Sequence, residues 1–158
     1  MKFKKYIDRG LEGTLGVLFI MMLSSVLWQV FSRYVLNDPS TFTDELARYL
    51  LIWVGILGAA YATGRGAHVA VDIIRTKLNN PRWLVIFIQL VIILFALLVL
   101  VIGGANLVHI SFELGQTSSA MKLPLGFVYI VLPLSGVIIC YYCLLEIIHP
   151  SNPAHESR

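Results

Sequence analysis

The segment that decides the fold class is residues 33–72, RYVLNDPSTFTDELARYLLIWVGILGAAYATGRGAHVAVD. Its centre, residues 49–62, contains no charged side chain, whereas acids and arginines flank it on both sides. The hydrocarbon core of a bilayer is about 30 Å thick, and roughly 20 helical residues, each rising about 1.5 Å, cross it. We therefore predict that residues 44–62 form a membrane-spanning helix with charged residues at its ends.

The composition of the whole chain extends this interpretation. Hydrophobic residues make up 58% of the 158 residues and charged residues 13%, against about 25% charged residues in a typical soluble domain. A soluble fold would leave much of that apolar surface in water, so we expect lipid to cover it. Three further apolar stretches, residues 11–35, 83–110 and 125–148, are long enough to cross a bilayer. The predicted fold is all-α: a single integral membrane domain, residues 1–158, with four transmembrane helices.

The distribution of Lys and Arg predicts the orientation in the membrane. Nine of the 12 basic residues lie in the N-terminal segment, between the second and third spans, or in the C-terminal tail. These are Lys2, Lys4, Lys5, Arg9, Arg65, Arg75, Lys77, Arg82 and Arg158. The opposite side carries Arg33, Arg48 and Lys122. Because cytoplasmic segments carry the excess of basic residues, both termini are predicted to be cytoplasmic. The net charge of +3 is spread over span ends and does not indicate nucleic-acid binding.

The second span begins with a group of charged residues. Thr41 is the predicted N-cap, and Asp44 and Glu45 follow in the first turn, where the positive end of the helix dipole favours acids. Steps of three and four residues place the following set on one face: Glu45, Arg48, Ile52, Gly55, Ala59, Ala62 and Gly66. This face is expected to carry an ion pair between Glu45 and Arg48, and a stripe of small residues that lets another helix approach closely. Two interpretations remain open: the stripe packs the protein's own helices, or it docks a helix of a partner.

The third and fourth spans carry few polar residues. Gln89 is the only polar side chain between residues 84 and 102, so much of this helix is expected to face lipid. Asn106, His109 and Glu113 follow on one face of the same helix. In the fourth span, Pro133 removes a backbone hydrogen bond, which predicts a kink.

Several runs of residues resemble the small membrane subunit of tripartite ATP-independent periplasmic (TRAP) transporters. The runs are Arg33-Tyr34, Asn37, Asp44-Glu45-Leu46-Ala47-Arg48-Tyr49, Trp53, Gly58-Ala59, His68-Val69, Val71-Asp72 and Ser119-Ala120-Met121-Lys122-Leu123-Pro124. The run from Asp44 to Arg48, together with His68, is the most specific part of the pattern. Phe42 departs from it, since a tryptophan is more usual there, but both side chains are aromatic groups suited to a membrane interface.

The resemblance implies an accessory membrane subunit that is not an enzyme. In such systems a periplasmic substrate-binding protein captures an organic acid, such as a carboxylate or an acidic sugar like sialic acid. A large membrane subunit then imports the acid, driven by a sodium gradient. The small subunit binds the large one in the bacterial inner membrane and holds it there, with no cofactor, metal or substrate site of its own. The residues assigned to the partner interface or to structural support are Arg33, Asp44, Glu45, Arg48, Gly55, Ala59, Ala62, His68 and Asp72.

Two other functions compete with this one. A membrane anchor subunit of a redox enzyme would hold haem between two histidines. However, His68 and His109 are predicted near opposite membrane faces, separated by most of the roughly 30 Å hydrocarbon core. A stand-alone carrier would show an internal repeat, or broken helices with polar residues near the midplane. The centres of the four spans are nearly free of charged residues, which disfavours transport by this chain alone.

Overall fold

Four helical rods, each long and apolar enough to cross a membrane, make up the part of the chain that is described, which confirms the all-α membrane fold. The structure is a computed structural model, and it describes residues 2–65 and 81–148. The first two rods are α1 (Lys2–Tyr34) and α2 (Thr41–Gly64). The third joins α4 (Pro81–Phe95), the π-helix η1 (Ala96–Gly103) and α5 (Gly104–Glu113), and the fourth joins α6 (Leu125–Tyr129) and α7 (Val131–Ile148).

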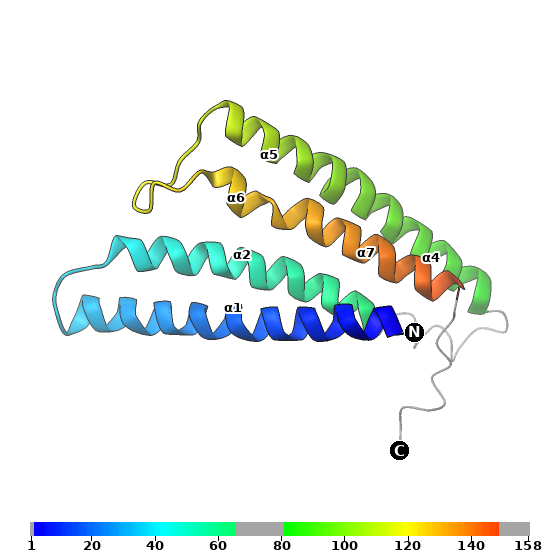
Figure 1. Cartoon of the computed structure of the whole chain (residues 1–158), viewed down its shortest axis with the longest axis horizontal. Helices are drawn as coiled ribbons and strands as arrows, with labels where there is room; N and C mark the ends of the chain where they lie inside the picture. The colour runs from blue at the N-terminus through cyan, green and yellow to red at the C-terminus, as the bar shows by residue number, and fades with distance from the viewer. Residues whose placement is uncertain (1, 66–80, 149–158) are drawn as a thin grey trace, which may run out of the picture.

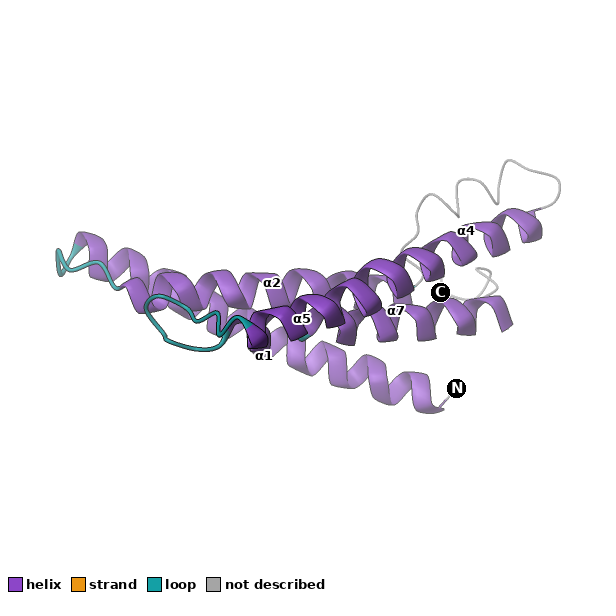
Figure 2. Cartoon of the chain, turned by 90° about the horizontal axis from the view of Figure 1, so that it is seen from above, coloured by secondary structure: helices purple, strands orange, loops and turns teal. Residues whose placement is uncertain are grey.

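The rods lie side by side in one row, in the order α1, α2, α6–α7 and α4–α5 (Figure 1). Close backbone contacts join α1 to α2, α2 to α7, and α7 to α4 and η1. Seen from above, the row is twisted, so that the beginnings of α1 and α4 diverge to opposite sides of α7 (Figure 2). The first residues of α1 and the last residues of α7 lie on the same side of the molecule. The first and last described residues therefore face the same side of the membrane. Which face this is stays a prediction.

Within residues 2–65 and 81–148, the row arrangement leaves two small apolar clusters as the core. One contains Leu11, Leu57, Val131 and Tyr142, and the other Ala60, Ala96, Ile139 and Cys143. Large apolar side chains elsewhere are exposed: Trp28 on α1 and Leu90 on α4, for example, are 52% and 54% exposed. In a membrane, such faces are covered by lipid tails or by helices of another subunit.

The turn between α1 and α2 corrects one detail of the sequence prediction. Ser40, not Thr41, is the N-cap residue, because its backbone is extended (φ −78°, ψ 98°) and Thr41 is the first helical residue. The Ser40 carbonyl accepts hydrogen bonds from the Asp44 amide at 3.3 Å and from the Thr43 hydroxyl at 3.1 Å. Before the turn, Asn37 takes a left-handed φ of 54°, a conformation common just after a helix end.

The third rod packs closely on α7 through two glycines. A Cβ placed on Gly136 would lie 2.8 Å from the Cβ of Leu100 and 3.2 Å from the carbonyl oxygen of Ala96. A Cβ placed on Gly104 would lie 2.8 Å from the Cβ of Leu132. Glycine at these two positions therefore lets the rods approach more closely than any other residue would, which in lipid is a main source of helix packing energy.

The fourth rod is interrupted between α6 and α7. Pro133 has no amide hydrogen to donate to the carbonyl of Tyr129, and α6 ends at Tyr129. The helix resumes at Val131 after the single residue Ile130. The interruption therefore lies where the proline predicts a disturbed helix.

Candidate functional site

The stripe of small residues on α2 faces outward from the chain. Gly55, Ala59 and Ala62 are all exposed, and a Cβ placed on Gly55 would meet no atom within 4 Å. The buried residues of α2 belong to other positions, namely Ala47, Leu50, Leu57, Ala60 and Gly64. No described helix of this chain covers these three residues, and Gly66, the last member of the predicted face, lies outside the described residues. Docking of a partner helix stays a prediction, and an uncovered face is what it requires.

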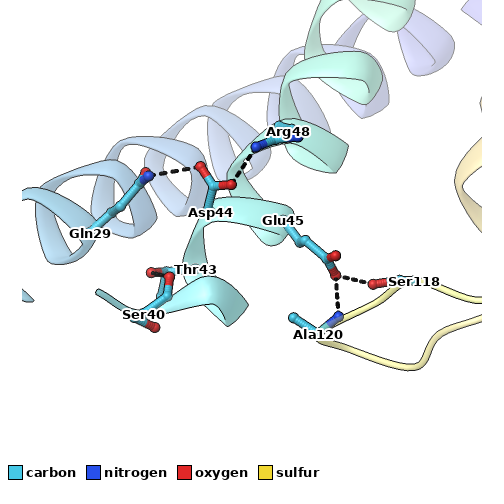
Figure 3. A network of polar contacts seen from close by, with 8 residues as sticks. All are labelled: Gln29, Ser40, Thr43, Asp44, Glu45, Arg48, Ser118 and Ala120. Carbon is cyan, nitrogen blue, oxygen red and sulfur yellow. Dashed lines mark hydrogen bonds and ion pairs between the residues drawn. The ribbon is translucent and has the colours of Figure 1, made fainter. Parts of the chain in front are cut away.

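Asp44, rather than Glu45, is the ion-pair partner of Arg48 (Figure 3). Arg48 Nη2 lies 2.5 Å from Asp44 Oδ2, and the side-chain amide of Gln29 donates to Asp44 Oδ1 at 2.8 Å. The predicted pair of Glu45 with Arg48 is wrong. Helical spacing allows Arg48 to reach either acid, but Glu45 points toward a different segment and Asp44 is left to pair with Arg48. The Arg48 side chain is 71% exposed, and exposed pairs contribute only about 0–1 kcal/mol.

Glu45 reaches the segment between α5 and α6, residues 114–124, which we call the α5–α6 loop (Figure 3). Its carboxylate oxygen Oε2 accepts a hydrogen bond from the Ser118 hydroxyl. The same oxygen accepts from the Ala120 amide at 3.0 Å and from the Met121 amide at 3.2 Å. Hydrogen bonds to an ionised acceptor are roughly twice as strong as neutral ones. Glu45 therefore fastens the beginning of α2 to a loop that is distant in the sequence.

The α5–α6 loop is also held by bonds within itself. The Ser118 amide donates to the carbonyl of Leu123 at 2.9 Å, and Lys122 takes a left-handed φ of 52° that closes a tight turn. The loop contains the run Ser119–Pro124 of the family resemblance. The structure thus brings this run against the run Asp44–Tyr49, a contact for which the sequence gives no direct signal beyond the presence of both runs in one pattern.

The remaining candidate residues do not join this network. Arg33 is exposed, and its guanidinium lies 5.9 Å from the centre of the ring of the next residue. His68 and Asp72 lie outside the described residues. On α5, His109 Nδ1 lies 3.4 Å from Glu113 Oε2, and the two side chains are 68% and 66% exposed. These two polar groups share an accessible face of α5, as their spacing predicts.

A second group of polar contacts, not predicted from the sequence, lies where α1 begins and where α2 and α7 end. The Tyr142 hydroxyl donates to Asp8 Oδ1 at 2.5 Å, which joins α7 to α1. Arg65 Nε donates to the hydroxyl oxygen of Tyr61 at 2.8 Å, and both residues also contact the carboxylate of Glu12. The feature of the sequence that could have indicated this group is Asp8 and Glu12, two acids one helical turn apart in a segment otherwise rich in basic residues.

Comparison with known proteins identifies the family to which these features belong. Residues 22–151 match the family described as tripartite ATP-independent periplasmic transporters, DctQ component. The chain is 31% identical over 140 residues to the sialic acid TRAP transporter small permease protein SiaQ of Vibrio cholerae, covering 83% of this chain and 81% of that protein. It is 31% identical over 102 residues to the C4-dicarboxylate TRAP transporter small permease protein DctQ of Rhodobacter capsulatus, covering 63% of this chain and 44% of that protein.

A third relative is a longer protein. The chain is 27% identical over 133 residues to the isethionate TRAP transporter permease protein DctMQ of Oleidesulfovibrio alaskensis, covering 78% of this chain and 20% of that protein. The family match includes part of α1, all of α2 and the described parts of the third and fourth rods. It also includes Glu45 and the loop to which Glu45 is fastened. The chain is therefore a multi-pass membrane protein and belongs to the DctQ component family, the small membrane subunits of TRAP transporters.

Proposed function

We propose that this chain is the accessory subunit of a sodium-driven, binding-protein-dependent transporter in the bacterial inner membrane. Its partners are a large membrane subunit, which moves the substrate, and a periplasmic protein, which captures it. The substrate is an organic acid, a carboxylate or an acidic sugar such as sialic acid. The names of two relatives, a sialic acid and a C4-dicarboxylate transporter subunit, support this class of substrate. The chain's own task is to dock the large subunit and hold it in the membrane.

The uncovered stripe on α2 carries this proposal. Small residues let a partner helix approach closely, and Gly55, Ala59 and Ala62 leave space that no described residue fills. The centres of the four rods, residues 13–32, 49–64, 83–112 and 123–145, contain no Asp, Glu, Lys or Arg. A chain that bound an organic acid within the membrane would be expected to place charged or polar groups there. Since DctMQ contains a similar segment in a much longer chain, a close association with a larger membrane protein is supported.

Recovery of the large subunit on a tagged small subunit tests the docking surface. Ala59→Leu adds a bulky side chain to the stripe, and over-packing a close contact costs about 1–3 kcal/mol. Because 1.4 kcal/mol is a factor of ten, the affinity for the large subunit should fall by about 5- to 150-fold. Val99→Leu on the exposed face of η1 is the matched control, since lipid tails adjust to an added methylene. Equal recovery of the large subunit on both variants would place the interface elsewhere.

Uptake into liposomes tests the accessory role itself. Sialic acid and C4-dicarboxylates should enter only when this chain, the large subunit and the binding protein are combined in the presence of a sodium gradient. Liposomes that contain this chain alone should show no uptake above empty liposomes. Sodium-driven uptake by this chain alone would contradict the proposal.

A further inference from the structure

The row of rods consists of two helical hairpins that meet along a single seam. The first hairpin is α1 with α2, and the second comprises α4, η1, α5, α6 and α7. Between them, α2 packs on α7 through small and apolar residues such as Leu57, Ala60 and Ile139. Lipid tails are as apolar as these side chains, so the seam gains little from the hydrophobic effect. The seam is therefore held by van der Waals packing, which is not directional.

Glu45 joins the two hairpins at one end of the seam. The residue belongs to α2, whereas its three donors, Ser118, Ala120 and Met121, belong to the α5–α6 loop of the second hairpin. The Met121 amide also lies 3.2 Å from the Ser118 hydroxyl oxygen, which ties the donors to one another. The three bonds to Glu45 converge on one carboxylate oxygen. This contact therefore fixes the beginning of α2 against the α5–α6 loop, which is itself held by internal hydrogen bonds.

Tyr142 joins the hairpins at the opposite end. It extends from α7 and donates its hydroxyl hydrogen to Asp8 on α1 at 2.5 Å. Its ring crosses α2 at Gly64: a Cβ on Gly64 would lie only 2.6 Å from the ring carbon Cζ. Tyr142 as a whole is 3% exposed, and Lys4 Nζ lies 6.0 Å from the centre of its ring. Because Gly64 has no side chain, the Tyr142 ring can pass beside α2 and reach Asp8 on α1.

We propose that Glu45 and Tyr142 are positioning residues that together fix the angle between the two hairpins. The two contacts lie at opposite ends of α2: from Glu45 to Gly64 the helix rises about 28 Å at 1.5 Å per residue. One contact alone acts as a pivot, whereas two contacts that far apart prevent the hairpins from turning about the seam. This inference rests on the proposed function, because a fixed angle presents the stripe on α2 to the large subunit in one orientation.

Distance measurements between spin labels test the inference on the full chain in lipid nanodiscs. Labels at Phe42 and Leu114, both exposed, report on the angle between the hairpins in a background in which the two native cysteines are replaced by alanine. The distance distribution should be narrow in the parent and should broaden when Glu45→Ala and Tyr142→Phe are combined. Asp44→Asn is the matched control, because Asp44 contacts only Gln29 and Arg48 in Figure 3, both within the first hairpin.

Hydrogen exchange provides a second, local measurement. A hydrogen bond to a charged acceptor contributes about 1.5–3 kcal/mol, so Glu45→Ala should speed exchange of the Ala120 and Met121 amides by about 10- to 100-fold. Glu45→Gln keeps an acceptor oxygen and should restore much of the protection. Asp44→Asn should leave both amides protected.

The outcomes separate this inference from the proposed function. With both contacts broken, the large subunit should still be recovered, the maximal uptake rate should fall, and the half-saturating substrate concentration should stay the same. If the double variant does not fold, the single variants Glu45→Ala and Tyr142→Phe carry the same distance test, because the one contact that remains acts only as a pivot. Distributions that stay as narrow as in the parent would overturn the inference, even where docking holds. Failure to recover the large subunit on the unaltered chain would instead contradict the proposed function.

Discussion

Gly64→Ala provides the sharpest test of how the rods are held together. The new Cβ would lie 2.6–2.8 Å from three carbons of the Tyr142 ring, which is closer than real Cβ contacts allow. The ring must therefore move, and because it is buried and bonded to Asp8, moving it breaks that hydrogen bond. The loss is bounded by the value of a hydrogen bond to a charged group, about 1.5–3 kcal/mol. Alanine recovers up to about 1 kcal/mol through its higher helix propensity. The expected net destabilisation is about 0.5–3 kcal/mol.

Gly58→Ala is the matched control in the same helix. A Cβ at this position would meet no atom within 4 Å, so the substitution should leave the stability unchanged or raise it by up to about 1 kcal/mol. Unfolding free energies of both variants, measured in the same lipid or detergent, should therefore differ by about 1–3 kcal/mol.

A double-mutant cycle identifies the cause of that difference. In a Tyr142→Phe background the bond to Asp8 is already absent, so Gly64→Ala should cost less than it does in the parent. Residues in contact typically show interaction energies of about 0.5–3 kcal/mol in such cycles. Additive effects, or equal stability of the Gly64→Ala and Gly58→Ala variants, would show that the Tyr142 ring does not require glycine at position 64.

Three further predictions concern orientation, surface charge and packing. A membrane-impermeant thiol reagent applied to intact cells should label Phe42→Cys and not Tyr6→Cys, because the excess of basic residues predicts a cytoplasmic N-terminus. Labelling of Tyr6→Cys and not Phe42→Cys would overturn the predicted orientation. Arg48→Ala should lower the unfolding free energy by no more than about 1 kcal/mol, because its pair with Asp44 is largely exposed, and a much larger loss would show that Arg48 is buried in the parent. Gly136→Ala should destabilise by about 1–3 kcal/mol, seen as a lower thermal midpoint, because the methyl group would press on η1; an unchanged midpoint would mean that η1 can shift without loss.

The sequence by itself determined the class of the protein and the number of its spans. Long apolar stretches have one stable form in lipid, since every backbone polar group must be bonded within its own helix. For that reason four helices follow from four stretches, and the interruption near Pro133 follows from its missing amide hydrogen. The runs around Asp44–Arg48 and Ser119–Pro124 resembled one family, and the comparisons confirmed that family.

Only the tertiary structure decided which residues meet. Helical spacing places Glu45 near both Arg48 and the membrane edge, but the choice of Asp44 as ion-pair partner depends on where Gln29 and the α5–α6 loop lie. Spacing likewise marks the stripe on α2 without showing which way it faces, because in lipid a small-residue face suits internal packing and docking equally well. The passage of Tyr142 across Gly64 joins segments from three helices. Such a contact depends on the order in which the rods lie side by side. The sequence cannot reveal this order, because the periodicity of one helix carries no information about which helix is its neighbour.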